Sequence, residues 1–354
     1  MRRYAGWCCP SGQQKRCLDL QKRPLSSRAG EGNRTLITSL EGWSSAIELR
    51  PRSFGESVAG GFYGPWHTSR VQLDFRLVDV FAERPLAGNQ LCVVLDVPES
   101  LDPGLMQAVA KEIGFSETTF VTAAKGDRYR MRIFTPGREL PFAGHPTLGT
   151  AFVLVSEGRV TSPAVQEVAA GEIPVEADAR RGFARMRQLP PEFDEEFPDR
   201  ERAAAAAGLG PEDLHPELPP QVVSTGLRQL IVPVRDADAV ARAAMDPPTL
   251  GAVVEHAGAD GFYLFAPTEE GAKARFFGPG VGVDEDAATG SAAGPLGAYL
   301  AARGFSGPIV VRQGEEIGRP SVLHVDVTGT GGDWQVTVGG GVFTVGGGEL
   351  DLPD

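Results

Sequence analysis

Two stretches of the chain carry the same succession of signals, and no other feature constrains the fold as much. Residues Arg132–Pro136 read RIFTP, and residues Arg275–Pro279 read RFFGP at a distance of 143 residues (275 − 132). Each copy leads through a loop to a helix of small residues, which starts near Gly144 in the first copy and near Gly290 in the second. The second loop is longer, because it spans 11 residues (290 − 279) against 8 (144 − 136). The repeat predicts two halves of similar topology, related by a pseudo-twofold axis.

Runs of apolar residues between glycine, proline and asparagine predict many strands and a few helices, and so an α+β fold. We expect strands at residues 75–81, 91–95, 115–121, 129–134, 221–224, 230–234, 309–312, 322–327 and 334–338, and helices at 105–113, 147–155 and 203–207. Gly114 suits a left-handed cap at the end of helix 105–113. The glycine triplets 339–341 and 346–348 predict turns around a terminal strand at residues 342–345.

A connection rich in proline and acidic residues, residues 189–220, separates the two halves. Such composition is typical of a segment between domains. We therefore expect a first domain at residues 71–190 and a second domain at residues 191–354.

Residues 1–70 differ from the rest of the chain. They hold 11 Lys and Arg against 5 Asp and Glu, a charge of +6, whereas the remainder carries 23 (34 − 11) against 41 (46 − 5), a charge of −18. The segment shows neither helical nor alternating periodicity. Two interpretations stay open: translation from a start codon placed too early, with the chain proper beginning near Val71, or an ordinary disordered tail. Neither interpretation gives the segment a function.

The net charge of −12 argues against a general partner of nucleic acids or of anionic membranes, and a small polar metabolite is the better partner. No apolar run is long enough for a signal peptide or a membrane span. Walker loops, dinucleotide-binding fingerprints, nucleophile elbows, zinc-protease motifs and Cys-x-x-Cys pairs are all missing from the sequence. We therefore expect neither a metal nor a cofactor.

Both glycine loops open helices, and the first amides of a helix have no partner within it and carry partial positive charge. A substrate carboxylate could bind the amides near Gly144 and Gly290 across a gap between the domains. Pro146 suits a first helical position, and Ser291 suits a cap. A single loop of this kind is more often a tight turn, but a matched pair favours a binding site.

Glu117 is the first candidate for proton transfer. By alternation along the strand it shares a face with Phe115, Thr119 and Val121. A glutamate on a buried face loses hydration, which raises its pKa and suits a general base. The alternative is an exposed glutamate at the end of a strand.

His145 and Asp286 complete the candidate set. His145 lies in a loop bounded by glycine, where the alternative is a residue that hydrogen-bonds the helix start. Asp286 ends the acidic triplet 284–286, where the alternative is a solvated or capping carboxylate. Carboxylates, one imidazole and helix-start amides suit the movement of protons next to a carboxylate-bearing carbon. The set predicts isomerisation or epimerisation without a cofactor.

Several motifs resemble the PhzF-like phenazine-biosynthesis family. They lie, in order from about residue 73 to residue 354, at 77–81, 85–89, 116–121, 134–136, 141–147, 224–227, 286–292, 313–314 and 318–321. The resemblance implies a diaminopimelate-epimerase-like fold, in which two similar α/β domains each curl a sheet around a central helix, with the site in the cleft. It also implies a cytoplasmic, cofactor-independent isomerase that is often a homodimer.

The same resemblance implies roles for single residues. Glu117 would be the general acid and base, His145, Asp286 and Ser291 would bind or help to protonate the substrate, and amides near Gly144 and Gly290 would hold its carboxylate. The family's named reaction isomerises trans-2,3-dihydro-3-hydroxyanthranilate. Related epimerases use two cysteines, whereas Cys92 is the sole cysteine after residue 70, which disfavours a two-thiol racemase. A non-catalytic metabolite-binding protein with the same cleft is the alternative function.

Overall fold

The computed structural model describes residues 70–168, 171–278, 283–305, 307–329 and 333–353, which belong to one compact unit. The expected leader, residues 1–70, lies outside the described residues except for Arg70, which begins the first strand. Among the residues described, none of the helices has the length and apolar character needed to cross a membrane.

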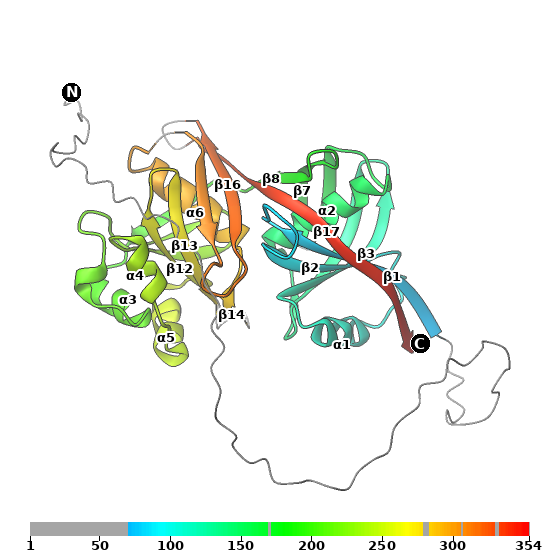
Figure 1. The fold of residues 1–354 in the computed structure, drawn as a ribbon, viewed down its shortest axis with the longest axis horizontal. Helices are drawn as coiled ribbons and strands as arrows, with labels where there is room; N and C mark the ends of the chain where they lie inside the picture. The colour runs from blue at the N-terminus through cyan, green and yellow to red at the C-terminus, as the bar shows by residue number, and fades with distance from the viewer. Residues whose placement is uncertain (1–69, 169–170, 279–282, 306, 330–332, 354) are drawn as a thin grey trace, which may run out of the picture. The chain divides into compact units, whose positions relative to one another are not determined.

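The chain forms two groups of strands, each with a helix against its inner face (Figure 1). The first group contains β1 (Arg70–Val80), β2 (Asn89–Val94), α1 (Pro103–Ile113), β3 (Glu117–Lys125), β4 (Arg128–Phe134), β5 (Glu139–Leu140), α2 (Gly144–Ser156), β6 (Ala164–Val168), β7 (Gly171–Asp178) and β8 (Phe183–Arg187). The second contains β9 (Glu192–Glu196), α3 (Arg200–Ala206), the 3-10 turn η1 (Pro211–Asp213), β10 (Gln221–Ser224), β11 (Arg228–Pro233), α4 (Ala237–Arg242), α5 (Pro247–Ala257), β12 (Gly261–Pro267), β13 (Gly271–Gly278), β14 (Val283–Asp286), α6 (Gly290–Ala301), β15 (Ile309–Gln313), β16 (Ser321–Thr328) and β17 (Gln335–Pro353).

Strands of the first group close into a ring. Pairing runs from β1 through β2, β3, β4, β6, β7 and β8 to β17, and β17 pairs with β1 again. Helix α2 contacts strands on all sides of this ring, from β1, β2 and β3 to β7, β8 and β17. The ring is therefore a closed barrel filled by a helix, which explains why the residues of α2 from Gly144 to Leu154 are buried.

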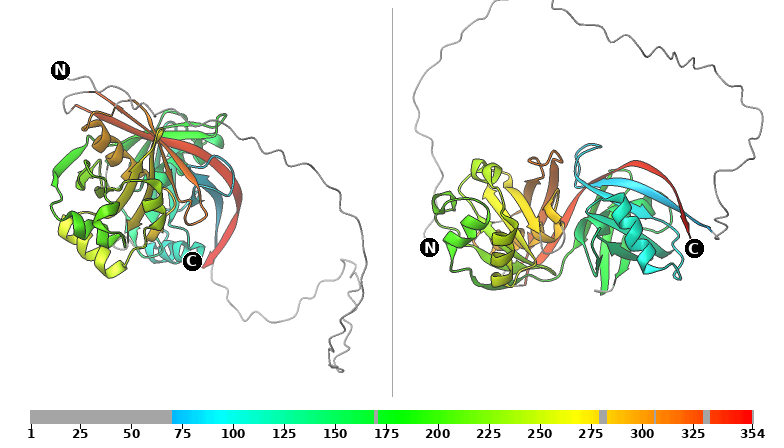
Figure 2. Two further views of the ribbon diagram at one scale, coloured as in Figure 1. Left: turned by 60° about the vertical axis from the view of Figure 1, so that its left-hand side comes forward. Right: turned by 90° about the horizontal axis from the view of Figure 1, so that it is seen from below.

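Alternation along β2 divides its side chains between two cores. Leu91 and Val93 pack in the core around α2, whereas Cys92 and Val94 pack with Met106 of α1. Helix α1 therefore covers the outer face of the barrel (Figure 2). It ends where the sequence predicts, because Gly114 takes the left-handed conformation with φ of 70°.

The second group repeats the order of pairings found in the first. Strands β10 and β11 pair antiparallel, β11 and β12 parallel, β12 and β13 antiparallel, and β13 and β15 parallel, as β1 to β4 and β6 do. Helix α6 packs against β10, β11, β16 and β17. The repeated arginines also correspond, because Arg132 binds both oxygens of Glu139 and Arg275 binds both oxygens of Glu285.

The expected turns at glycine triplets 339–341 and 346–348 are wrong. Both triplets lie inside the continuous strand β17, which pairs first with β16 and β8 and then with β1. A Cβ on Gly341 would lie 2.1 Å from the carbonyl oxygen of Ala82, and one on Gly340 would lie 2.6 Å from the Phe81 ring. These glycines allow a close approach of neighbouring chain, which a sequence pattern does not distinguish from a turn.

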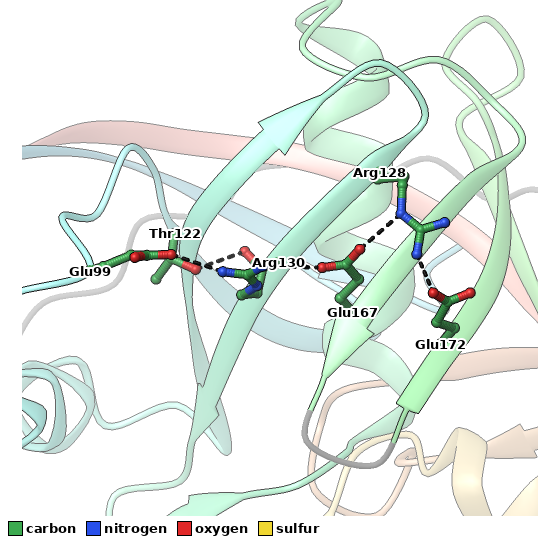
Figure 3. A network of polar contacts seen from close by, with 6 residues as sticks. All are labelled: Glu99, Thr122, Arg128, Arg130, Glu167 and Glu172. Atoms are coloured by element: carbon green, nitrogen blue, oxygen red, sulfur yellow. Dashed lines mark hydrogen bonds and ion pairs between the residues drawn. The ribbon is translucent and has the colours of Figure 1, made fainter.

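An exposed ladder of ion pairs ties the outer ends of β4, β6 and β7 together (Figure 3). Arg128 contacts Glu167 at 2.8 Å and also Glu172, and Arg130 contacts Glu99 at 2.8 Å and Glu167 at 3.4 Å. Exposed pairs of this kind contribute about 0–1 kcal/mol each. They support the strand register and lie apart from the cavity described next.

Candidate active site

The starts of α2 and α6 meet. A Cβ on Gly144 would lie 3.1 Å from the backbone nitrogen of Ser291, and one on Gly290 would lie 2.9 Å from the Phe81 ring. The two glycines thus allow two helix starts to come into contact, as the paired loops suggested. Their first amides point partial positive charge into the same region, which suits a bound anion.

A cavity of about 280 Å³ opens at this meeting point. All six of the residues singled out from the sequence line it, namely Glu117, Gly144, His145, Asp286, Gly290 and Ser291. Both groups of strands supply its wall, which also includes Leu227, Gln229 and Phe276. A substrate held here would therefore contact residues from both halves of the sequence.

Glu117 begins β3 with a side chain only 13% exposed. Burial raises its pKa to about 8, the negative charge of Asp286 adds to the rise, and a hydrogen bond from Ser116 opposes it. The expected face is correct for Val121, which packs in the α2 core, but Phe115 packs in the α1 core. Phe115 departs because β3 starts only at Glu117, so alternation does not extend back to it.

His145 is the second residue of α2 and is buried. Its Nε2 lies 3.4 Å from Oε2 of Glu117, and neither atom has a hydrogen-bond partner among the described residues. Burial lowers the pKa of His145 to about 3, against a hydrogen bond with the Gln90 backbone. At neutral pH the imidazole is therefore uncharged beside a glutamate that retains its proton.

Asp286 comes from the other half of the chain. Its Oδ1 accepts from Nδ2 of Asn89 at 2.7 Å, and its Oδ2 accepts from Oγ1 of Thr289 at 2.6 Å. Burial raises its pKa to about 6, while the hydrogen bonds from Thr289 and Asn89 lower it. Two acids with raised pKa values thus share one cavity with a neutral histidine, an arrangement found where protons are transferred.

The helix caps differ from those expected. Thr289 caps α6 and Ser291 is its second residue, while α2 starts at Gly144, which makes Pro146 its third residue. Thr289 uses its hydroxyl on Asp286 rather than on the helix. The acidic triplet 284–286 lies in β14 rather than in a solvated loop.

Sequence reasoning missed the polar residues that hold these groups. Asn89 links the two halves, because its Nδ2 also donates to the carbonyl of Ala288 at 3.0 Å and lies 3.2 Å from Nδ1 of His145. Gln313 donates to the carbonyl of Asp286 and to Thr289. Both residues lie in motifs of the family resemblance, at 85–89 and 313–314, which assigned them no role. The positive φ of 72° at Gly88 marks a sharp bend just before Asn89.

Cys92 is buried in β2, where burial raises the pKa of its thiol to about 12. Such a thiol stays protonated and inert. Within the part of the chain that the structure describes, no group of three or more histidine, cysteine, aspartate or glutamate side chains could hold a metal ion.

Comparison with known proteins identifies the family of this chain. The model of the family described as phenazine biosynthesis-like protein, PhzC-PhzF, matches residues 78–348. The chain belongs to this family. It is 36% identical over 287 residues to the trans-2,3-dihydro-3-hydroxyanthranilate isomerase of Pseudomonas fluorescens, and the match covers 79% of this chain and 99% of that protein.

Solved structures agree with this assignment. The PhzF-family protein of Bacillus anthracis matches with a TM-score of 0.71 and 30% identity over 79% of this chain and 99% of that chain. The hydroxyproline epimerase of Agrobacterium vitis matches with a TM-score of 0.54 over 82% of this chain and 94% of that chain, and at 15% identity it shows a shared fold alone. The chain is an isomerase of the PhzF type with a mixed α/β fold.

Proposed function

We propose that this PhzF-type isomerase moves a proton on trans-2,3-dihydro-3-hydroxyanthranilate or on a similar cyclic carboxylate. The observation that carries the proposal is the juxtaposition of Glu117, with its pKa raised to about 8, and the facing helix starts at Gly144 and Gly290. The Pseudomonas fluorescens relative, which is named for this substrate, supports the same reaction.

In the proposed mechanism, the first amides of α2 and α6 bind the substrate carboxylate, and Ser291 contributes its hydroxyl. The ionised fraction of Glu117, a minority at neutral pH with a pKa of about 8, takes a proton from the neighbouring carbon, and the electrons of that bond spread into the conjugated carboxylate. Glu117 then returns a proton at another carbon. With pKa values of about 6 and about 3, Asp286 is mostly ionised and His145 is uncharged at neutral pH, so Asp286 can accept a proton and the imidazole can hydrogen-bond during this exchange.

We further propose that the two strand groups are duplicated domains related by a pseudo-twofold axis, divided near residues 190 and 191. The repeated order of strand pairings supports this division. Strand β17 starts in the second group and pairs with β1 in the first, so the residues after 341 serve the first domain. A homodimer and a cytoplasmic location remain predictions from the family resemblance.

The direct test is to incubate the purified protein with trans-2,3-dihydro-3-hydroxyanthranilate and follow the substrate by NMR. Isomerisation that depends on Glu117, His145 and Asp286 is the expected result. Tight binding without any movement of hydrogen would instead favour the non-catalytic metabolite-binding protein.

A further inference from the structure

A second cavity, of about 260 Å³, adjoins the site. Asp286 lines both cavities, and the other residues around the second cavity include Asn89, Ser116, Glu285, Ile317 and Arg319. Ile317 is 41% exposed, so this cavity meets solvent at a place where the substrate cavity has no lining residue. Its charged and amide-bearing wall offers the partners that water requires.

A short chain of hydrogen bonds separates the two cavities. The hydroxyl of Ser116 donates to Oδ1 of Asn89 at 3.1 Å, and Nδ2 of Asn89 donates to Oδ1 of Asp286 at 2.7 Å. Ser116 also precedes Glu117 in the chain, and its hydroxyl lowers the pKa of the Glu117 carboxyl against the effect of burial. Ser116, which lines the second cavity, is therefore the chain neighbour of Glu117, which lines the first.

The second cavity matters when substrate occupies the first cavity. A bound substrate fills the space next to Glu117, and a filled cavity excludes water from the groups that carry protons. A hydroxyl can accept one hydrogen bond while it donates another, so Ser116 can pass a proton without moving its own oxygen.

We propose that the second cavity is the route by which the protons of Glu117 and Asp286 exchange with solvent while the substrate fills the first cavity. The proposal rests on the proposed function. Glu117 takes the proton of a C–H bond, and the electrons of that bond remain on the substrate. The new O–H of Glu117 passes its proton to Oγ of Ser116, whose own proton moves to water in the second cavity. The reverse passage from heavy water leaves O–D on Glu117, and this deuteron forms the new C–D bond.

The test follows the hydrogen that is transferred when trans-2,3-dihydro-3-hydroxyanthranilate is isomerised in heavy water under single-turnover conditions. Mass spectrometry of the product gives the fraction of molecules that retain the original hydrogen. Ile317→Trp narrows the mouth of the second cavity without touching the first, and Ser116→Ala removes the relaying hydroxyl. We expect each change to raise the retained fraction by roughly twofold or more, because water no longer reaches the carrier groups.

Phe305→Trp is the matched control, because Phe305 is 48% exposed and lines neither cavity. It should leave the retained fraction at the wild-type value. Deuterium incorporation that is unchanged in both Ile317→Trp and Ser116→Ala would overturn the proposal, as would full retention of hydrogen in the wild type. Absence of any turnover in the wild type would instead contradict the proposed function itself.

Discussion

Burial shifts the pKa values of Glu117 and His145 in opposite directions. Loss of hydration favours the neutral form of each, so it raises the pKa of the glutamate to about 8 and lowers that of the histidine to about 3. Both are uncharged at neutral pH, and a modest change around the substrate can ionise the glutamate. The two residues therefore form a neutral pair that becomes negatively charged when Glu117 ionises.

The raised pKa of Glu117 makes the free energy of unfolding depend on pH. Between the ordinary value of 4.5 and about 8, folded Glu117 holds a proton that the unfolded chain releases, so its contribution to stability is lost as pH rises through that window. Glu117→Gln removes this pH-dependent loss of stability, because glutamine does not titrate. We expect the variant to melt above the wild type at pH 8, by the equivalent of a few kcal/mol, with the difference shrinking towards pH 5.

Calorimetry across that pH range measures the effect. Glu172→Gln is the control, since it replaces a glutamate of an exposed ion pair that does not line the cavity. A difference in melting temperature between Glu117→Gln and wild type that is constant with pH would contradict the raised pKa.

Gly144 permits a second prediction. A Cβ there would lie 3.1 Å from the Ser291 amide, within the surface assigned to the substrate carboxylate. Gly144→Ala should weaken the binding of a carboxylate ligand by about tenfold, the equivalent of one lost hydrogen bond to a charged group. Isothermal titration with 3-hydroxyanthranilate measures it.

Gly251→Ala is the matched control, because Gly251 lies within α5 and a Cβ added there would meet no neighbouring atom within 4 Å. It should leave binding unchanged and stabilise the helix by about 0.5–1 kcal/mol. Equal effects of the two substitutions on binding would show that Gly144 does not form part of the surface that binds the carboxylate.

At the scale of elements, the glycines of strand β17 differ in how closely other parts of the chain pack against them. Gly341 is pressed against Ala82, whereas a Cβ on Gly346 would have only the Leu77 side chain within 4 Å, at 3.8 Å. Gly341→Ala should cost about 2 kcal/mol or more through overpacking. Gly346→Ala should be neutral or stabilising by about 0.5 kcal/mol, because alanine loses less backbone entropy. Urea unfolding of the two variants separates these outcomes, and a reversed order would contradict the close packing at Gly341.

The same strand marks the limit of prediction from sequence. Alternation and the repeat correctly indicated most strands and both glycine-loop helices, because these depend on local pattern. The glycines of β17 could not be assigned, since their role depends on chain that lies far away in sequence, at Phe81 and Ala82. At the site, the titrating residues stand out by chemistry, whereas Asn89 and Gln313 act through contacts across the chain.

At the scale of the whole molecule, an ion pair between a buried aspartate and a partly buried arginine connects the halves beside the site. Arg319 donates to Oδ1 of Asp79 at 2.5 Å and to the carbonyls of Ala87 and Gly88, each at 2.9 Å. These contacts fix the loop that ends at Asn89, and Asn89 in turn reaches Asp286. The position of a residue from the first half therefore depends on an arginine from the second.

Arg319→Met tests this connection. It leaves Asp79, which is only 2% exposed, without its cation, and we expect a loss of about 3–5 kcal/mol in unfolding free energy. Arg76→Met removes an arginine from a half-exposed pair with Glu157 and should cost about 1 kcal/mol or less. Similar losses of unfolding free energy in the two variants, measured by chemical denaturation, would show that the Arg319–Asp79 pair contributes no more to stability than the Arg76–Glu157 pair.

The central claim is that Glu117 moves the proton. It is tested most directly by exchange of the carbon-bound hydrogen of trans-2,3-dihydro-3-hydroxyanthranilate in deuterated buffer, with ligand affinity measured in parallel. Glu117→Gln keeps the shape of the side chain and removes the basic carboxylate. We predict that folded Glu117→Gln loses at least about 10²-fold in exchange and turnover while it still binds the substrate, because the helix-start amides are untouched. Exchange at the wild-type rate in the folded variant would contradict the account.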